Sequence, residues 1–393
     1  MQRLRRHRWL AVAAAVTCIA VLTSAASAVA QRGTGTHAAA GATRSRAPRH
    51  IFYIMMENHG YREIIGNWRD APFINRLARR ANTERDYFGV THPSLPNYLA
   101  AVSGSFQGIW DDCKAGSDVT CTPEEFVPGS GDATDGNYLT QAEVQSASAT
   151  PHLFNSANLV DQLQQHHLSW RAYMQSMPSV GSQVEYAPTI HGTTVKLYAQ
   201  KHNPFMYFSD INYAGSPRLR HIVPLGNRLA RDLRSGNVPN FVWISPDQCH
   251  DMHGVDPASA QLIGIPTCGY PDSGLDHGAI RLGDAFLRRT VRMITGSPVW
   301  RTSRSSIVIT WDEDDYSGIA GTSTSPAGRN GVILGGAHVP MLVLNSQGGA
   351  RRVMSVPANH YNLLATIQQE WHLGCIAATC SMPRQQLLTP LFN

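Results

Sequence analysis

The chain has 393 residues, of which 42% are hydrophobic and 16% are charged, and these proportions exclude a disordered tail protein and a highly charged coiled coil. The 33 basic and 28 acidic side chains give a formal charge of +5, but four of the arginines lie in residues 1–30, so the remaining 29 basic side chains face 28 acidic ones. A general positive field is therefore absent from the rest of the chain, and we expect no nucleic-acid partner.

The first segment has the pattern of a secretory signal peptide. Four arginines precede an apolar run over residues 9–22, and small residues with two A-x-A patterns follow, ending at Ala28 and Ala30. We therefore expect a signal peptide over residues 1–30 and a secreted chain, either extracellular or associated with the cell wall. The alternative is an uncleaved membrane anchor, although the apolar run is shorter than the roughly 20 residues of a span. We expect no stable membrane insertion of the remainder.

The rest of the chain is predicted to form a linker and one domain. Residues 31–49 are mostly Gly, Ala, Thr, Ser and Arg, a composition typical of a flexible linker. Residues 50–393 show no internal repeat and no second linker, so a single domain is the simplest interpretation. Within it, residues 113–151 are rich in Gly, Ser, Asp and Thr and are predicted to form a long insertion.

Apolar strands alternate with helical segments along this domain. The runs typical of buried strands are Ile51–Met56, Phe241–Ile244, Ile307–Trp311 and Val339–Leu344. The segments with helical periodicity are Leu159–His166, Asn227–Leu233, Gly283–Ile294 and Tyr361–Trp371. This alternation predicts an α/β fold with a mostly parallel central sheet and helices on both faces. In such sheets, ligands bind beyond the carboxyl ends of the strands.

A hydroxyl group that could act as a nucleophile follows the first strand. In the run Thr-His-Pro-Ser-Leu-Pro-Asn-Tyr over residues 91–98, Ser94 fits the N-cap of a helix that has Pro96 in its first turn and Gly104 near its end. A hydroxyl at that position lies where backbone N–H groups and the helix dipole stabilise anions, which suits attack on phosphorus. The alternative is an ordinary capping serine.

Acidic residues follow three of the predicted strands. Glu57 and Asn58 come directly after the first strand, Asp251 and His253 lie shortly after the second, and the acidic run 312–315 follows the third. If these strands are parallel neighbours, the carboxylates meet at one edge of the sheet and repel one another unless a cation neutralises them. The sequence therefore indicates a metal site. The alternative is that these acids are ordinary turn and N-cap residues.

The cysteines outside the signal peptide form local pairs. They are Cys113 with Cys121, Cys249 with Cys268, and Cys375 with Cys380. This spacing suits three short-range disulfides in an oxidising compartment, although other connectivities remain possible. A cysteine-based zinc site is the competing interpretation, but the sequence contains no C-x-x-C pattern.

Six motifs together resemble a known family. The runs IFYIMMENHG, THPSLPNYLAAVSG, KHNPFMYF, ISPDQCHDMHG, IVITWDEDD and ANHYNLLATI are similar, in this order, to those of the bacterial phosphoesterases, which include secreted acid phosphatases and phospholipases C within the alkaline phosphatase-like superfamily. The resemblance covers residues 50–372. It implies an α/β/α sandwich of the alkaline phosphatase-like type and hydrolysis through a phosphoryl-enzyme intermediate at a metal site.

The resemblance also implies roles for single residues. It makes Glu57, Asn58, Asp312 and Glu313 the metal ligands and Ser94 the nucleophile. Asn97 would support the phosphoryl oxygens, His253 would contact the phosphate or protonate the leaving group, Asp251 would orient His253, and His360 would lie near the phosphate or the metal. His202, in the segment 201–204, could reach the substrate phosphate or could have only a packing role.

These observations predict a secreted, metal-dependent acid phosphatase that hydrolyses phosphate monoesters of small molecules or lipids, phosphoinositides included, through a phosphoserine. Oxygen ligands favour Mg, Ca or Mn, whereas histidine ligands at His253 or His360 would favour Zn or Fe. The run after Glu57-Asn58 departs from the phospholipase C pattern, and the chain has only about 20 residues after the last motif, so the shorter phosphatase branch is the closer match. The alternatives are a phospholipase C that cleaves phospholipid diesters and a non-catalytic cell-surface binding protein.

Overall fold

The structure is a computed structural model that describes residues 47–123, 127, 139–270, 276–314 and 335–393. Residues Arg46–Asn393 form one compact unit. The predicted signal peptide and all but the last three residues of the predicted linker lie outside the described residues. Among the helices of the described part, none combines the length and apolar composition that a membrane span requires.

A central sheet of eight strands organises this unit. The strand order is β11-β2-β10-β9-β1-β8-β4-β7, and every neighbouring pair is parallel except the two that involve β10. The strands are β1 His50–Met56, β2 Asn82–Glu84, β4 Trp170–Met174, β7 Ile222–Pro224, β8 Phe241–Ser245, β9 Ser305–Trp311, β10 Met341–Asn345 and β11 Val353–Met354. The predicted α/β fold with a mostly parallel sheet is therefore confirmed. The four predicted strands correspond to β1, β8, β9 and β10.

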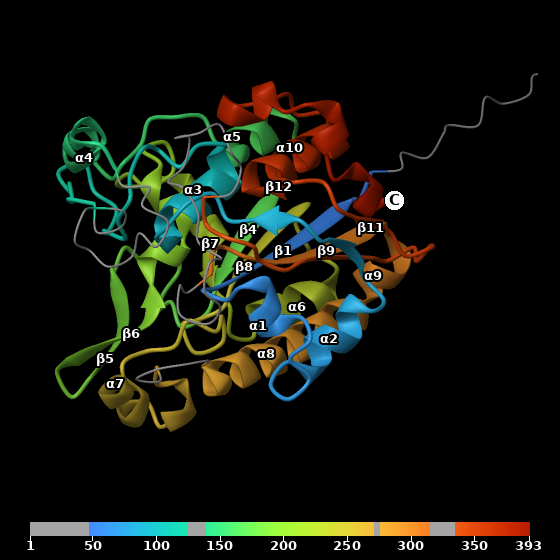
Figure 1. The fold of residues 1–393 in the computed structure, drawn as a ribbon, viewed down its shortest axis with the longest axis horizontal. Helices are drawn as coiled ribbons and strands as arrows, with labels where there is room; N and C mark the ends of the chain where they lie inside the picture. Colours follow the sequence, from blue (N-terminus) through green and yellow to red (C-terminus); the bar gives the residue numbers. More distant parts are fainter. Residues whose placement is uncertain (1–46, 124–126, 128–138, 271–275, 315–334) are drawn as a thin grey trace, which may run out of the picture. The chain divides into compact units, whose positions relative to one another are not determined.

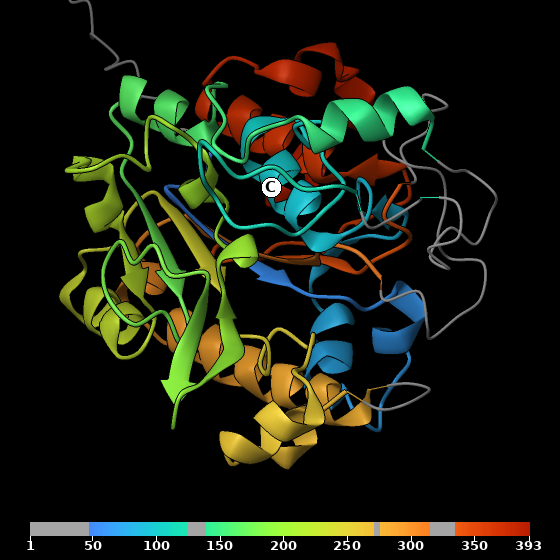
Figure 2. The ribbon, with the colours of Figure 1, turned by 90° about the vertical axis from the view of Figure 1, so that its left-hand side faces the viewer.

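Helices cover both faces of the sheet (Figures 1 and 2). On one face lie α3 Ser94–Ser103, α5 Leu159–Gln165 and α10 His360–Trp371. On the other lie α2 Pro72–Ala78, α6 Arg228–Ser235, α8 His277–Thr295 and α9 Pro298–Thr302. Each of the four predicted helical segments coincides with one of these helices. The structure extends α8 by six residues toward its N-terminus, where the Asp276 carboxylate accepts a hydrogen bond from the Ala279 N–H.

The structure also contains smaller elements outside the central sheet and its main helices. They are α1 Tyr61–Ile64, α4 Gln141–Ser148, α7 Pro257–Leu262, the paired strands β3 Tyr87–Phe88 and β12 Ala358–Asn359, the hairpin of β5 Tyr186–Ile190 with β6 Thr193–Ala199, and the 3-10 turns η1 Gln200–His202, η2 Pro204–Tyr207, η3 Pro217–His221, η4 Pro266–Cys268, η5 Ala377–Ser381, η6 Arg384–Gln386 and η7 Thr389–Phe392. Three disulfides join the cysteine pairs that the sequence predicts: Cys113–Cys121, Cys249–Cys268 and Cys375–Cys380.

The three strands that precede the acidic residues are neighbours. β1 lies between β8 and β9 and is parallel to both, with Ile54 opposite Ile244 on one side and Met56 opposite Trp311 on the other. All the residues of these strands are buried, because helices cover both faces. The carboxyl ends of the three strands therefore lie at one edge of the sheet, and the residues after them meet there.

Candidate active site

Ser94 lies at the N-terminus of α3, above the ends of these strands. The sequence predicted Ser94 as the N-cap of this helix. In the structure Pro93 is the N-cap, and Ser94 is the first residue of the helix. Gly104 ends the helix in the left-handed conformation, with φ 67°, as predicted. Ser94 is almost completely buried, at 1% exposure. The helix start fixes the Ser94 backbone and thereby aims its hydroxyl toward the edge of the sheet.

Three oxygen atoms from distant parts of the chain surround the Ser94 hydroxyl. Its Oγ lies 2.9 Å from Oε2 of Glu57, 3.3 Å from Oδ1 of Asn58 and 3.0 Å from Oε1 of Glu313. A hydroxyl group has one proton and can donate it to only one of these acceptors at a time. The other oxygens therefore face a lone pair and one another, an arrangement that needs either protonated carboxyl groups or additional positive charge.

The carboxylates at this point lie in a strongly unfavourable environment for negative charge. Glu57 and Asp312 are completely buried. Burial, and then the charge of Asp312, raises the pKa of Glu57 well above its usual value. Burial, and then the charge of Glu313, raises the pKa of Asp312. One oxygen of Asp312 accepts a hydrogen bond of 3.1 Å from the Asn58 N–H, whereas its Oδ2 has no hydrogen-bond partner among the described residues.

This donor set fits a hard divalent cation. Oxygens of Glu57, Asn58 and Glu313 lie within 3.3 Å of Ser94 Oγ, and the Asp312 carboxylate accepts a hydrogen bond from the Asn58 N–H. Each of the four residues offers an oxygen ligand of the kind that Mg²⁺, Ca²⁺ and Mn²⁺ prefer. The buried and unpartnered Oδ2 of Asp312 is the atom that most clearly lacks a positive partner. The structure thus brings together all four residues that the resemblance assigns to the metal.

Lys201, on η1, supplies a fixed positive charge beside the hydroxyl. Its Nζ lies 3.4 Å from Ser94 Oγ and 2.6 Å from Oδ2 of Asp112, whose other oxygen accepts a hydrogen bond from the Leu95 N–H. Burial lowers the pKa of Lys201, but the charges of Asp112 and Glu57 outweigh this effect and raise it overall, so the ammonium group stays charged. Asp112 therefore connects the start of α3 to Lys201.

The next residue, His202, links the first and second strand ends. Its Nε2 lies 3.2 Å from Oε1 of Glu57 and its Nδ1 lies 3.2 Å from Oδ2 of Asp251, while its ring stacks on Tyr98 with 5.2 Å between the ring centres. Burial, and then the charge of Lys201, lowers the pKa of His202 well below its usual value. Both ring nitrogens face protein carboxylates, so in this geometry His202 positions Glu57 and Asp251 and does not itself offer a nitrogen to substrate.

His253 is held by the loop after β8. Its backbone N–H donates to Oδ1 of Asp251 at 2.8 Å, and its Nδ1 lies 2.9 Å from the carbonyl oxygen of Gly254. This second contact assigns the proton to Nδ1, which leaves Nε2 for other partners. Burial, and then the charge of Lys201, lowers the pKa of His253 to about 3. Asp251 thus orients His253 through its backbone, not through its imidazole.

Two other residues that the sequence assigned to the site, His360 and Asn97, contact the segments that carry its acidic residues. Nε2 of His360 lies 2.8 Å from the carbonyl oxygen of Asp312 and its Nδ1 lies 3.0 Å from the Tyr87 hydroxyl; burial lowers the pKa of His360 to about 4. The Asn97 side chain accepts hydrogen bonds from the Val90 and Thr91 N–H groups and donates to carbonyl oxygens of the same loop and to Oε2 of Glu313. Both side chains therefore hold the segments that carry the acids.

A close approach of two glycine segments also fixes Asp312. A Cβ on Gly89 would lie 2.6 Å from the Asp312 carbonyl oxygen and 2.7 Å from that of Gly336, and a Cβ on Gly335 would lie 1.6 Å from the Val90 carbonyl oxygen. Only glycine allows these backbones to come so near. The loop that precedes Ser94 is thereby pressed against the segment that follows the third strand.

Three residues of the site were not predicted to belong to it. They are Asp112, Tyr98 and His92, whose Nδ1 lies 2.7 Å from Oε2 of Glu313. His92 and Tyr98 flank Ser94 within the motif 91–98, which is a signal that could have identified them. Asp112 carries no such signal, because only the tertiary fold brings it to the start of α3.

The sequence is similar to those of known proteins. The profile of a family described as the Phosphoesterase family matches residues 67–264 and 270–374. A phosphatidylinositol-3-phosphatase of Mycobacterium tuberculosis is 27% identical over 327 residues, which cover 82% of this chain and 77% of that protein. An acid phosphatase of Aspergillus fumigatus is 22% identical over 82% of this chain, and a probable acid phosphatase of Kluyveromyces lactis is 22% identical over 83% of it. The matches cover 55% and 59%, respectively, of these two fungal proteins.

Solved structures with a similar fold include a protein in the alkaline phosphatase superfamily from Vibrio parahaemolyticus. It has 12% identity and a TM-score of 0.46 over 86% of this chain and 70% of that one. The phosphonate monoester hydrolase of Agrobacterium radiobacter has 13% identity and a TM-score of 0.44 over 83% of this chain and 74% of that one.

Proposed function

The chain belongs to the phosphoesterase family and is a phosphoric ester hydrolase, and from this premise we propose that it is a metal-dependent phosphomonoesterase with Ser94 as its nucleophile. One observation carries the proposal: the Ser94 hydroxyl lies within 3.3 Å of oxygens from Glu57, Asn58 and Glu313. A serine that only caps a helix does not need oxygen atoms from three distant residues around its hydroxyl. A nucleophilic serine that loses its proton beside a cation does need them, because these oxygens can accept the proton and bind the cation.

Glu57, Asn58, Asp312 and Glu313 would hold the cation. A divalent ion bound there would neutralise the carboxylates, lower the pKa of the Ser94 hydroxyl and stabilise the charge that develops on the phosphoryl oxygens. The oxygen donors of these four residues support Mg²⁺, Ca²⁺ or Mn²⁺ over Zn²⁺ or iron. Of the two histidines that could favour Zn²⁺ or iron, His360 has both ring nitrogens engaged within the protein, and we assign the Nε2 of His253 to proton transfer.

Residues of the chain would then carry out two displacements at phosphorus, the first by Ser94 and the second by water. In the first, the bond between Ser94 Oγ and phosphorus forms and the ester bond to the leaving oxygen breaks. The Ser94 proton has two carboxylate acceptors, Oε2 of Glu57 at 2.9 Å and Oε1 of Glu313 at 3.0 Å. Lys201 would bind a phosphoryl oxygen from the side of the hydroxyl, since its Nζ is 3.4 Å from Ser94 Oγ.

His253 would move the proton of the leaving group. Its Nε2 is neutral in the free protein, but a phosphate dianion arriving beside Lys201 raises the pKa of an adjacent imidazole, so a proton can be taken up with the substrate. Nε2 then donates this proton to the leaving oxygen. In the second displacement, water attacks phosphorus and Nε2 accepts its proton. The bond from phosphorus to Ser94 breaks, Ser94 Oγ takes back the proton that the carboxylate accepted in the first displacement, and inorganic phosphate is released.

For the substrate, we propose phosphate monoesters of small molecules or lipids, phosphoinositides included. The relative named as a phosphatidylinositol-3-phosphatase covers most of this chain and supports the lipid ester, and the fungal relatives named as acid phosphatases support simpler monoesters. We further propose that the protein is secreted, since the N-terminal signal pattern and three disulfides both fit an oxidising compartment.

The products of a substrate panel test this proposal. The panel comprises a soluble monoester, a phosphatidylinositol monophosphate and phosphatidylcholine, each assayed with and without chelator. We expect inorganic phosphate from the first two substrates only, loss of activity with chelator, and recovery on addition of Mg²⁺, Ca²⁺ or Mn²⁺. Release of phosphocholine would instead indicate a phospholipase C, and no turnover of any ester would indicate a binding protein.

A further inference from the structure

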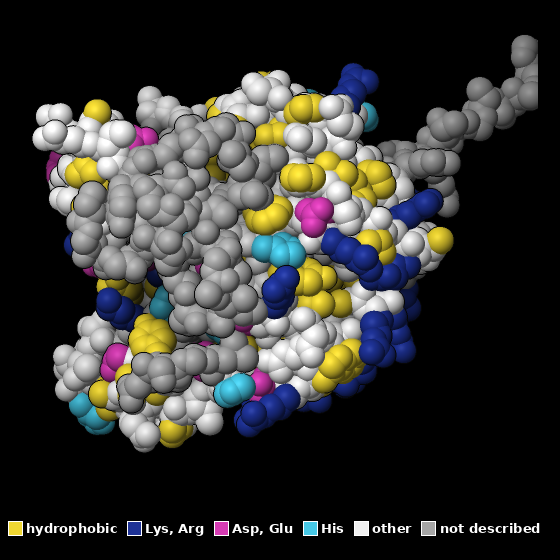
Figure 3. Space-filling model, in the orientation of Figure 1, with side chains coloured by type: hydrophobic (Ala, Val, Ile, Leu, Met, Phe, Trp, Pro, Cys, Tyr) yellow, Lys and Arg dark blue, Asp and Glu magenta, His cyan; other side chains and the backbone are white. Residues whose placement is uncertain are grey.

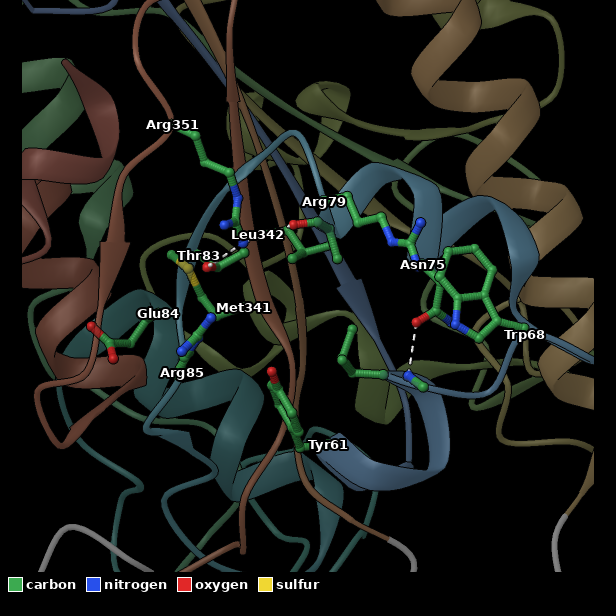
Figure 4. Close-up of a pocket in the computed structure, with 13 residues that line it drawn as sticks. Tyr61, Trp68, Asn75, Arg79, Thr83, Glu84, Arg85, Met341, Leu342 and Arg351 are labelled. Atoms are coloured by element: carbon green, nitrogen blue, oxygen red, sulfur yellow. Dashed lines mark hydrogen bonds between the residues drawn. The ribbon is translucent and has the colours of Figure 1, made fainter.

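A second feature of the molecule lies outside the candidate active site. It is an open hollow of about 410 Å³ between α1, α2 and the strands β2 and β10, closed on one side by the segment before β11 (Figure 4). Its lining includes Tyr61, Trp68, Arg79, Arg85 and Arg351. None of the residues to which the proposed mechanism assigns a step lines this hollow.

The hollow is positively charged. Three arginines line it, whereas its one acidic residue, Glu84, is buried and uses Oε1 to accept hydrogen bonds from the Asp86 and Val356 N–H groups. In Figure 4 the Glu84 carboxylate points away from Arg79 and Trp68, and burial raises its pKa. Among the described residues, no carboxylate forms an ion pair with Arg79, Arg85 or Arg351.

Two of the three arginines also have structural contacts. The Arg351 guanidinium donates to the carbonyl oxygens of Ala81 and Ala78 at the end of α2, and the Arg79 guanidinium lies 4.3 Å from the centre of the Trp68 ring. These contacts hold both groups at the rim of the hollow. Arg85 has no side-chain hydrogen bond within the described part of the chain, so the stability of the fold does not explain its position.

The surface around the hollow extends this charge. Every arginine of residues 61–85 is exposed, while the three acidic residues of the same segment are buried, and residues 335–356 contain no acid at all. The exposed arginines of these segments are Arg62, Arg69, Arg76, Arg79, Arg80, Arg85, Arg351 and Arg352. Figure 3 shows Lys and Arg side chains gathered on this side of the molecule.

Exposed apolar side chains lie among these arginines. Trp68 is 42% exposed at the rim of the hollow, and Val353, which follows Arg351 and Arg352 on β11, is 40% exposed. A hydrophilic polyanion that has no bases to stack on tryptophan gains nothing from exposed Trp and Val. A bilayer interface offers phosphate groups to arginines and a partly apolar layer to tryptophan.

We propose that this arginine-lined hollow binds the phosphate group of an anionic phospholipid and docks the protein on an anionic bilayer. Arg85 would contact the headgroup phosphate within the hollow, Arg79 and Arg351 would complete the cation cluster from the rim, and Trp68 and Val353 would enter the interfacial layer. This site goes beyond the proposed esterase activity, because docking requires neither Ser94 nor the cation.

Vesicle sedimentation tests the proposal. The full chain is mixed with vesicles of phosphatidylcholine alone or of phosphatidylcholine with phosphatidylserine, and the bound fraction is measured. Residues 1–46 are identical in every variant, so their contribution to binding is the same in all the proteins that are compared. Replacing Arg79 and Arg85 by Gln should lower partitioning onto the anionic vesicles by about tenfold or more, since each arginine near such a surface contributes on the order of 1 kcal/mol.

The matched control replaces Arg231 and Arg234, two exposed arginines of α6, by Gln. This variant loses the same charge and should bind the anionic vesicles nearly as well as the parent. Trp68→Ala should weaken binding while leaving the net charge unchanged. All these variants should hydrolyse a soluble monoester at the parent rate, which separates docking from catalysis.

Three results would overturn the inference. The first is equal binding of the parent to neutral and anionic vesicles. The second is equal loss of binding in the Arg79/Arg85 variant and in the α6 control, which would indicate a diffuse charge effect. Binding of glycerol phosphate at the hollow without any binding to anionic vesicles would also contradict docking and would indicate a site for a soluble ester.

Discussion

The Ser94 hydroxyl oxygen lies 2.9 Å from Oε2 of Glu57, although 37 positions separate the two residues in the sequence. The contact forms because β1 delivers Glu57 to the edge of the sheet where α3 begins. Neither side chain is exposed to solvent, at 1% and 0% respectively. A buried carboxylate beside a buried hydroxyl and two further acids is costly without positive charge.

Asp312→Asn should have opposite effects with and without a divalent cation. With chelator, the variant should melt at a higher temperature than the parent, because it removes one of the buried charges that repel one another while its Oδ1 still accepts from the Asn58 N–H. With Mg²⁺ or Ca²⁺, the parent should gain the larger stabilisation, because the cation binds only the folded state. Thermal melts of both proteins measure this crossover.

Asp232→Asn provides the control for this measurement. Asp232 is also a buried carboxylate, but it is paired with Arg171 and Tyr173, away from the site. Its replacement should lower the melting temperature by the same amount in chelator and in cation. If Asp312→Asn behaved in the same way, no cation would be bound at Asp312.

Lys201 should contribute to kcat/KM through both its positive charge and its position beside Ser94. Lys201→Met removes the ammonium group that lies 3.4 Å from Ser94 Oγ and should lower kcat/KM by about a hundredfold or more. It also leaves Asp112 without its partner at the start of α3. Lys201→Arg should recover part of the activity, because the charge remains although the geometry differs. Steady-state kinetics on a soluble monoester provides the comparison.

Lys196→Met serves as the matched control for Lys201, because Lys196 is exposed on β6 and contacts the Tyr186 ring. It should leave kcat/KM near the parent value. Equal losses in the two variants would show that lysine charge acts at long range and not at Ser94.

The sequence predicted the central part of this site because its strands are simple. β1, β8 and β9 are continuous apolar runs, and such strands occupy the middle of parallel sheets, so the acids that follow them were expected to meet. The order of the strands shows that these three are neighbours. The short edge strands β7 and β11 have three and two residues and carry no comparable pattern, so they were not predicted.

The supporting contacts could not be read from the sequence. The Asp112 carboxylate caps α3 only because the segment 110–113 crosses the start of that helix. The bridge from Glu57 through His202 to Asp251 joins three segments that no local pattern connects. His360 was expected near the phosphate or metal, and its contact with the backbone carbonyl of Asp312, a proposed metal ligand, could not be foreseen. Side-chain direction at such positions is decided by tertiary packing.

The disulfide Cys249–Cys268 should matter more for activity than Cys375–Cys380. The first encloses the loop that carries Asp251 and His253, whereas the second closes a short turn after α10. Replacing Cys249 and Cys268 by Ser should lower kcat/KM about tenfold or more, since small displacements of a proton donor are costly. Replacing Cys375 and Cys380 should have little effect on kcat/KM. Steady-state kinetics of both double variants under oxidising conditions compares the two disulfides. Equal losses of kcat/KM would contradict the proposed role of His253 as the proton donor.

His152 should make stability depend on pH. Its Nε2 lies 2.7 Å from Oδ1 of Asp111; burial lowers the pKa of His152, but this contact outweighs burial and raises the pKa above 6.5. A raised pKa means that the charged pair stabilises the fold fully below pH 6.5 and loses this effect as pH rises through the folded pKa. The difference in melting temperature between the parent and His152→Gln should therefore narrow above pH 6.5.

His166→Gln is the control for that series, because His166 is exposed at the end of α5. Its melting temperature should follow that of the parent at every pH. A constant difference between the parent and His152→Gln across the same range would show that His152 acts only by packing.

The identity of the nucleophile is tested most directly by trapping the covalent intermediate. The enzyme is mixed with a phosphate monoester, quenched with acid within one turnover, digested and analysed by mass spectrometry. We expect one phosphoryl group on the peptide that contains Ser94, no such label in Ser94→Ala, and an unchanged label in Ser103→Ala, whose hydroxyl lies on the same helix and donates to the Leu99 carbonyl. A label on another residue, or undiminished turnover by Ser94→Ala, would contradict it.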